Sequence, residues 1–341
     1  IFVTMKKVGK NPHSLPFLKS LKIQKLQNSI AQSQNNYDLN GLYGSSKSFL
    51  INKLFDSKRN LLWILNDKES SIYHFNDLEN FIGGKYCSFF PSSYNKYKDF
   101  KKTNSQSVFK RTEVIKNLNS ENNSQIIVTY PEAIFEKIIQ KKEIKKRILK
   151  ISKGQVLNLD IFNEQLFDFE FNREDFVFEP GDFSVRGGIV DVFSYSNKLP
   201  YRIEFFGDEV ESIRTFDIES QVSNNTFESI EILADLENKE SSYNRENIFN
   251  FISANSVIIT ENLIFLKDEL KDLHRYLTEI NSTQNEFNPE RISKLFYNGD
   301  SLLSDLKKFS VINLKGNKSE KQNIFNIIPQ PAFNKKFDLL I

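Results

Sequence analysis

The sequence contains one cysteine, Cys87, and one tryptophan and one methionine among 341 residues. A single cysteine excludes a disulfide framework within the chain and suits a reducing compartment. No apolar run reaches the roughly 18 residues that a membrane-spanning helix needs, and no secretory signal peptide can be recognised. We therefore expect a cytoplasmic protein that does not associate with a membrane.

A strong excess of charge of one sign is also lacking. The chain has 46 basic and 44 acidic residues, so its net charge of +2 gives no overall electrostatic case for nucleic acid. A hydrophobic content of 39%, with 32 phenylalanines, excludes a wholly disordered chain, and the length allows two or three domains. The chain opens on IFVT and closes on FDLLI in mid-pattern, so we expect a fragment.

Residues that could hold a metal or act as a nucleophile are few. His13, His74 and His274 lie far apart, with no cysteine pair near any of them. They lack metal-ligand spacing and are interpreted as surface or hydrogen-bonded histidines. Cys87 has no activating base in its local sequence and is interpreted as a small buried residue. We predict no metal site and no catalytic residue.

Short apolar runs indicate an α/β fold. The runs at 61–65 and 126–128 are typical of buried strands in a parallel sheet, and 256–260 and 310–314 are two more. Amphipathic patterns between these runs predict helices, at 14–32, after the Gly/Ser loop near residue 45, within 104–125 and at 132–140. Strands that alternate with helices predict a doubly wound α/β domain.

One segment looks like a phosphate-binding loop. Residues 41–48 (GLYGSSKS) align with G-x-x-x-x-G-K-[ST] at Gly41, Lys47 and Ser48, and Gly44 lies inside the loop. Such a loop turns backbone N–H groups toward phosphate, with the lysine on the outer phosphates and the hydroxyl on Mg²⁺. Ser46 stands where the second glycine belongs, and its Cβ can obstruct the approach of phosphate.

A carboxylate motif that would complete a nucleotide hydrolase is missing. The nearest candidate is LLWILND, in which Asp67 is followed by Lys68. A hydrolase needs Mg²⁺ ligands and a group that positions water in addition to the loop. We therefore predict a relic loop that takes no nucleotide cofactor, with an active nucleotide hydrolase or helicase lobe as the alternative.

A basic run, Lys141–Lys153 (KKEIKKRILKISK), holds seven basic residues and one acid. It can be interpreted as a solvated linker or helix face, or as a patch that binds DNA.

The most informative stretch is 178–223. Pro180-Gly181-Asp182 predicts a turn, and 189–193 (IVDVF) reads as a strand preceded by a Gly-Gly pair, which marks a bulge or a close backbone approach. The runs 201–206 and 209–216 predict a hairpin that turns at Gly207-Asp208.

Alternation along this hairpin gives each side chain a face. The odd-numbered residues of 201–205 share one face, and Arg202, Glu204 and Phe206 share the other. If the first face packs inward, Phe206 is exposed beside Arg202, and an aromatic ring next to arginine is typical of an interface hot spot. The alternative is that a neighbouring helix covers Phe206.

The runs PGDFSVRGGIVDVF and PYRIEFFGDEVESIRTFDIESQ resemble the second domain of the transcription-repair coupling factors, the Mfd family. This domain is shared with the excision-repair protein UvrB and docks onto UvrA. The resemblance implies that Arg186 of the RGG turn, Arg202 of the PYR strand and Phe206 of the FF pair contact UvrA. Glu204 and Arg214 are further candidates because they adjoin these residues on the hairpin.

The resemblance also implies a fold. It is a discontinuous, doubly wound and degenerate motor-like α/β domain with an inserted small α+β UvrB-like second domain. We expect residues 1–147 and 236–341 to form the first domain, with the start of a linker, and 148–235 to form the second. The resemblance is specific at 178–223, moderate at 88–138 and near the C-terminal end, and weak elsewhere.

The implied function is that of an adaptor. The fragment would dock UvrA and so recruit nucleotide excision repair to a stalled RNA polymerase in the bacterial cytoplasm. It would not be an enzyme, because ATP and Mg²⁺ belong to a DNA-translocating motor outside this chain, and RNA polymerase and DNA would be bound by other domains. The alternative within this resemblance is an ATP-binding helicase lobe of a UvrB-type repair protein that binds DNA.

Overall fold

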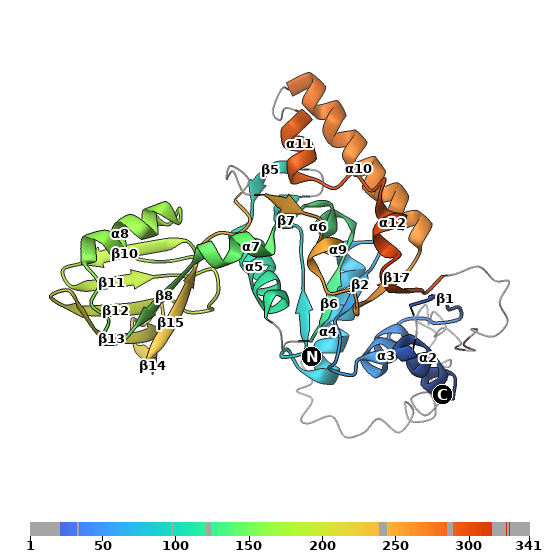
Figure 1. Ribbon diagram of the computed structural model, residues 1–341, viewed down its shortest axis with the longest axis horizontal. Coiled ribbons are helices and arrows are strands. Elements are labelled where there is room, and N and C mark those ends of the chain that lie inside the picture. Colours follow the sequence, from blue (N-terminus) through green and yellow to red (C-terminus); the bar gives the residue numbers. More distant parts are fainter. Residues whose placement is uncertain are drawn as a thin grey trace, which may run out of the picture.

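The computed structural model describes residues 21–32, 34–96, 99–120, 124–238, 244–284, 289–315, 325 and 327. The protein has a mixed α/β architecture, in which one sheet is parallel and another is antiparallel. Elements α2–β7 and β16–β18 make up the parallel sheet and the helices and short strands around it, and are called the parallel unit. Elements β8–β15 are called the antiparallel unit. The short helices α7 (Lys141–Ile144) and η1 (Lys145–Arg147) lie between the two units (Figure 1).

The parallel sheet has six strands in the order β1-β18-β17-β2-β6-β3, and every neighbouring pair is parallel. Its strands are β1 (Asn36–Asp38), β18 (Ser310–Asn313), β17 (Val257–Thr260), β2 (Leu61–Ile64), β6 (Ile126–Thr129) and β3 (Cys87–Phe89). The strands β2, β6 and β17 are buried at all four positions, as their unbroken apolar sequences predict. Strands from before and after the antiparallel unit therefore share one sheet.

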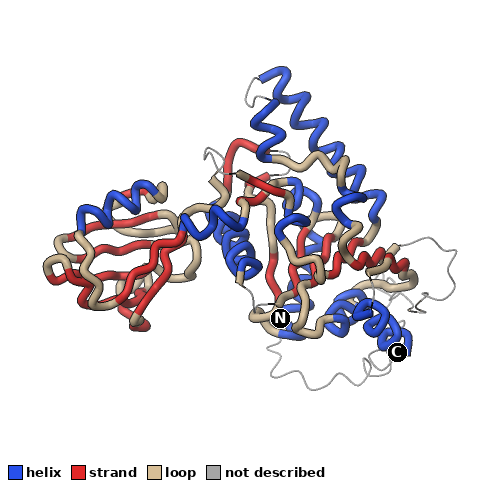
Figure 2. Tube along the Cα trace, in the orientation of Figure 1, coloured by secondary structure: helices blue, strands red, loops and turns tan. Residues whose placement is uncertain are grey.

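The helices of the parallel unit pack around this sheet (Figure 2). They are α2 (Leu21–Gln32), α3 (Ser46–Leu54), α4 (Lys68–Ile82), α5 (Ser105–Asn119), α6 (Pro131–Phe135), α9 (Ile248–Phe251), α10 (Leu263–Gln284), α11 (Pro289–Leu295) and α12 (Leu302–Leu306). Smaller strands accompany them: β4 (Tyr94–Lys96), β5 (Asp99–Thr103), β7 (Ile138–Ile139) and β16 (Arg245–Glu246). The expected helix within 104–125 is confirmed as α5. The first part of the helix expected at 14–32 lies outside the described residues.

The helix expected at 132–140 is wrong beyond its first turn. Helix α6 ends at Phe135, and residues 138–139 form β7, which pairs with β16. The backbone N–H of Lys137 donates to the carbonyl of Leu295 at 2.8 Å. These long-range hydrogen bonds replace the helical ones, and nothing in the local sequence signals them.

The antiparallel unit has a six-stranded sheet in the order β14-β13-β12-β11-β10-β9, in which every neighbouring pair is antiparallel except the edge pair β10–β9, which is parallel. Its strands are β14 (Ser223–Thr226), β13 (Glu209–Phe216), β12 (Tyr201–Phe206), β11 (Ile189–Val192), β10 (Asp182–Arg186) and β9 (Asn172–Arg173). The pair β8 (Ile148–Ser152) and β15 (Ser229–Leu233) and the helix α8 (Leu159–Asp168) complete the unit. Phe162 and Leu166 of α8 are buried with Ile203 and Phe205 of β12, so this face of the sheet forms the core.

The predicted hairpin is confirmed, because β12 and β13 begin and end where the alternating pattern does. The Gly187-Gly188 pair turns the chain from β10 into β11. A Cβ at Gly188 would lie 2.8 Å from the carbonyl oxygen of Phe205, and this carbonyl adjoins a register shift between Glu204 and Phe205. The close backbone approach expected from the glycine pair is therefore present.

Two charged side chains of α5 pair with carboxylates in the antiparallel unit or in the segment that follows it. Arg111 is fully buried, and its Nε lies 3.1 Å from Glu237 Oε2, just beyond β15, while its Nη1 lies 4.0 Å from Glu136 Oε1. The same Nη1 donates to the carbonyl oxygens of Pro91 and Ala133. At the exposed side of the helix, Lys116 Nζ lies 3.5 Å from Glu231 Oε2.

We predict that Arg111→Ala lowers the free energy of unfolding by about 3–5 kcal/mol, because it leaves two buried carboxylates without their shared cation. Lys116→Ala removes a partly exposed pair from the same helix and should cost less than about 1 kcal/mol. Urea denaturation of the two variants and the wild type measures the difference. Equal effects of the two substitutions would contradict a structural role for the buried cluster.

Candidate functional site

A buried carboxylate, Asp191, organises the face of the antiparallel sheet that lies opposite α8. Arg202 stands across from it in the neighbouring strand, with Nε 2.7 Å from Oδ1 and Nη2 2.8 Å from Oδ2. Arg186 of β10 binds Oδ2 from the other side. Asp191 is 2% exposed, and its hydrogen bonds raise the pKa of Arg202. Two guanidinium groups therefore share one carboxylate, which leaves the cluster with a net positive charge.

Each of the two arginines also contacts an aromatic ring, and Arg202 contacts an amide as well. The guanidinium of Arg202 lies 4.1 Å from the ring centre of Phe216 and donates to Gln221 Oε1 at 2.9 Å. The guanidinium of Arg186 lies 5.1 Å from the ring centre of Phe176. The side chain of Arg202 is only 13% exposed, whereas that of Arg186 is 37% exposed.

The sequence led to the expectation that both arginines contact a partner. In the structure, the planar fork of Arg202 is bound to Asp191 of its own sheet. Arg186 is the more accessible of the two cations.

The two further candidates pair with each other across the hairpin. Arg214 Nη1 donates to Glu204 Oε2 at 2.9 Å, and Ser212 Oγ donates to the same oxygen at 2.7 Å. The hydrogen bond from Ser212 and those from Arg214 lower the pKa of Glu204. This pair forms a second, neutral charge cluster beside the Asp191 cluster.

Phe206 ends β12 and is the most exposed large hydrophobic side chain of the described residues, at 79%. The preceding Phe205 is 8% exposed and lies in the core. Gly207 follows with φ +60°, a conformation that glycine adopts without strain. The alternative that a neighbouring helix covers Phe206 is wrong.

The loop at 41–48 has its phosphate-binding groups bound to other parts of the protein. Lys47 Nζ pairs with Glu261, which follows β17, and Lys315 Nζ also approaches Glu261 at 3.5 Å. Ser48 Oγ lies 2.7 Å from His74 Nδ1 and donates to Asp77 Oδ2 at 3.0 Å.

The two glycines of this loop adopt backbone conformations with positive φ. Gly41 has φ +78°, and a Cβ there would overlap the carbonyl oxygen of Phe325, whose N–H donates to Asn40 O at 2.7 Å. Gly44 has φ +50° and open space around it. Ser46 does not face a ligand, since its hydroxyl donates to the carbonyl of Tyr43 at 2.6 Å.

The remaining single candidates are Cys87 and the three histidines. Burial, together with Glu79, raises the pKa of the Cys87 thiol to about 12, so the thiol stays protonated. His74 is buried and hydrogen-bonded, His274 is partly buried on α10, and His13 lies outside the described residues. No group of three or more His, Cys, Asp or Glu within the described ranges could hold a metal ion. No helix in this part of the chain is long and apolar enough to span a membrane.

The basic run Lys141–Lys153 does not form one surface element. It passes through α7, η1 and β8, and Lys150 stands opposite Glu231 in the β8–β15 pair. The sequence did not point to Asp191 as the shared partner of the two arginines. The available signal was an aspartate between two valines in a predicted strand. The neighbouring strand carries an arginine at the matching register.

Comparison with known proteins agrees with this geometry. Residues 149–237 match the model of the UvrB interaction domain, so the antiparallel unit is a UvrB interaction domain. The chain is also similar to transcription-repair-coupling factors, and the resemblance to that family inferred from the sequence is confirmed. It is 31% identical to the factor of Escherichia coli K12 over 108 residues, 32% of this chain and 9% of that protein. It is 36% identical to the factor of Staphylococcus epidermidis over 124 residues, 36% of this chain and 9% of that protein.

A longer alignment, to the factor of Rickettsia bellii, is 28% identical over 181 residues and covers 52% of this chain and 16% of that protein. The aligned region therefore spans about a tenth to a sixth of the length of these relatives.

We predict that His74 makes the unfolding free energy depend on pH. Burial, reinforced by Lys47, lowers the pKa of His74 from 6.5 to about 4 in the folded protein. The unfolded chain therefore binds a proton below about pH 6.5 that the folded protein does not take up until about pH 4. This contribution lowers the free energy of unfolding as the pH falls through that window.

Urea denaturation of the wild type and His74→Gln at several pH values isolates the effect, because other titrating groups are common to both. The stability advantage of the wild type over the variant should shrink from pH 6.5 to pH 4. An advantage that stays constant with pH would show that His74 titrates normally.

Proposed function

We propose that this chain is the UvrB-homology module of a transcription-repair coupling factor and docks UvrA. In this role it recruits nucleotide excision repair to a stalled RNA polymerase in the bacterial cytoplasm. The observation that carries the proposal is Phe206, a ring 79% exposed at the tip of a hairpin in the UvrB interaction domain, beside a fixed arginine–carboxylate cluster. RNA polymerase and DNA would be bound by other domains of the whole factor, and its ATP-driven translocation would also lie there.

The docking mechanism follows from how the face is held. Phe206 supplies the apolar anchor, which fills a pocket of the partner. Arg186, with 37% of its side chain exposed, supplies a cation for an acidic group, and Arg202 keeps Asp191 and Arg186 in position. Side chains fixed before binding lose little conformational freedom on association, and hot spots concentrate on such anchors.

We also propose the finer domain plan. The parallel unit is a doubly wound relic of a motor domain, formed by residues 1–147 and 236–341, and residues 148–235 are inserted into it. Support comes from β17 and β18, which lie after the antiparallel unit in the sequence and join β1 and β2 in one sheet.

The relic loop, in this proposal, binds no nucleotide, and the module is not an enzyme. Lys47 already forms an ion pair with Glu261. The hydroxyl of Ser48, which a Mg²⁺ ion would need as a ligand, is hydrogen-bonded to His74 and Asp77. A helicase lobe of the UvrB type would require these groups to be available for nucleotide. The relatives at hand also favour the coupling factor over that alternative.

We predict that a fluorescent ATP analogue, with Mg²⁺ present, shows no saturable binding to this chain at equilibrium. The positive control is an intact nucleotide-binding ATPase measured in the same buffer. Saturable binding that disappears in Lys47→Ala would contradict the relic interpretation and support the helicase lobe.

We predict that Phe206→Ala weakens binding of purified UvrA by about 2 kcal/mol or more, roughly 30-fold in dissociation constant. The ring makes little contact with its own domain, so the free energy of unfolding should not change. Phe167→Ala is the matched control, because this ring is 50% exposed on α8, at the opposite face of the sheet. Titration by fluorescence anisotropy measures the affinities.

Arg202→Ala should weaken UvrA binding and also lower the free energy of unfolding, because it leaves Asp191 buried with only Arg186 as a partner. This pattern separates the supporting residue from the anchor. Wild-type affinity in a folded Phe206→Ala protein would remove the proposed site.

A further inference from the structure

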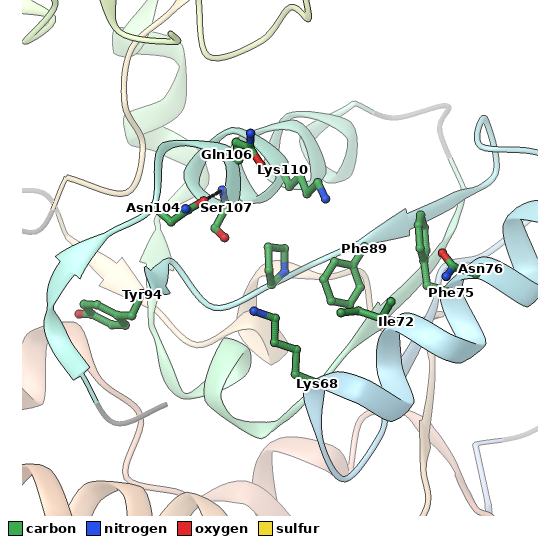
Figure 3. A pocket seen from close by; sticks show the side chains of 11 residues that line it. Lys68, Ile72, Phe75, Asn76, Phe89, Tyr94, Asn104, Gln106, Ser107 and Lys110 are labelled. Atoms are coloured by element: carbon green, nitrogen blue, oxygen red, sulfur yellow. Dashed lines mark hydrogen bonds between the residues drawn. The ribbon is translucent and has the colours of Figure 1, made fainter. Parts of the chain in front are cut away.

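A groove follows the first turns of α5 and reaches both units. In the parallel unit, a hollow of about 360 Å³ lies between α4 and α5, and its lining includes Phe89 and Pro91 (Figure 3). A second hollow, of about 440 Å³, lies between α5 and the antiparallel unit. Gln106 and Lys110 line both hollows. The two therefore meet at one pair of side chains, and each has the volume of a binding pocket.

The groove carries more positive than negative charge. Lys68 and Lys110 line the first hollow, and Lys110 and Lys198 line the second. Figure 3 shows Lys68 and Lys110 approaching the first hollow from opposite helices. No carboxylate of the described residues forms an ion pair with any of these lysines, and Glu179 is the one acid in the two linings. The groove thus offers three cations that form no ion pair with a carboxylate of the described residues.

Apolar surface lies beneath these cations. The second hollow is lined by Phe109 of α5 and, from the antiparallel unit, by Phe178, Phe193 and Ile218. Phe178 is 69% exposed, although it is a large hydrophobic side chain. In the first hollow, Lys110 Nζ stands 5.9 Å from the ring centre of Phe89.

We propose that this groove binds an acidic segment of a partner protein, with one apolar side chain seated in the second hollow. The lysines pair with its carboxylates, and Phe109, Phe178 and Ile218 enclose the apolar side chain. Charge complementarity identifies the acidic character, and the mainly apolar second hollow selects a peptide over a nucleic acid. A single-stranded nucleic acid would need successive open aromatic faces for stacking, whereas Phe89 is 9% exposed, Phe193 is 5% exposed, and Phe178 is the one ring of the two linings that is more than half exposed.

The test is a selection from a phage-displayed library of random peptides against the full chain, which involves neither UvrA nor Phe206. We expect the selected peptides to combine Asp or Glu with an aromatic or aliphatic residue. The triple variant Lys68→Glu, Lys110→Glu and Lys198→Glu should bind them at least about tenfold more weakly than the wild type. The matched control, Lys53→Glu, Lys58→Glu and Lys307→Glu, changes three exposed lysines outside the groove and should bind them as the wild type does.

The variant Phe178→Ser tests the second hollow. It should weaken binding of the same peptides, and a selection against it should still yield acidic sequences. Selection that yields no enriched sequence, or peptides that bind the groove variant and the wild type equally, would overturn the proposal. A single-stranded oligonucleotide that displaces the peptides and loses binding in the groove variant would overturn it in favour of nucleic acid. Circular dichroism of each variant verifies that the fold is retained.

Discussion

The candidate docking face depends on one carboxylate that is removed from water. Asp191 is 2% exposed and would be costly to bury alone, but it accepts hydrogen bonds from both Arg186 and Arg202. This arrangement fixes the direction of two long side chains that would otherwise sample many rotamers. It also ties together β10, β11 and β12, so the strand that ends at Phe206 is held at the same point. Burial of charge here is better explained by the geometry it imposes than by a gain in stability.

The loop at 41–48 is also held by charged and polar groups of its own unit. The ammonium group of Lys47 needs an anion beside it. The carboxylate of Glu261, in the segment that follows β17, is that anion. The hydroxyl of Ser48, which would face Mg²⁺ in an active loop, is directed to His74 and Asp77. The loop therefore keeps its shape without phosphate, and the glycine at 41 is required by the backbone of Phe325. Retention of Lys47 and Ser48 in the sequence is compatible with a purely structural role.

Short periodic patterns in the sequence predicted most of the buried strands and the main hairpin. Buried strands at 61–64 and 126–129, and the hairpin of 201–216, follow from unbroken apolar runs and from alternation, which also exposes Phe206. The sequence could not predict contacts between distant segments. The pairing of β7 with β16 ended a helix that its own residues favour, and the hydrogen bonds between Arg202 and Asp191 join two strands that local patterns do not place side by side. In both cases the residue that makes the contact lies in another strand. Its register with that strand cannot be read from the local sequence.

The two proposed surfaces differ in how their charges are used. On the sheet of the antiparallel unit, the exposed ring stands among arginines already paired with internal carboxylates, so binding there can rely on an apolar anchor and on a rigid frame. In the groove beside α5, the lysines have no ion pairs within the described residues, so an incoming acid would meet cations that lose only water. The groove also reaches both units, because α5 and the antiparallel unit share the lining of its second hollow. A ligand seated there would contact both units at once and would be sensitive to their relative position, whereas Phe206 lies within one unit and would not.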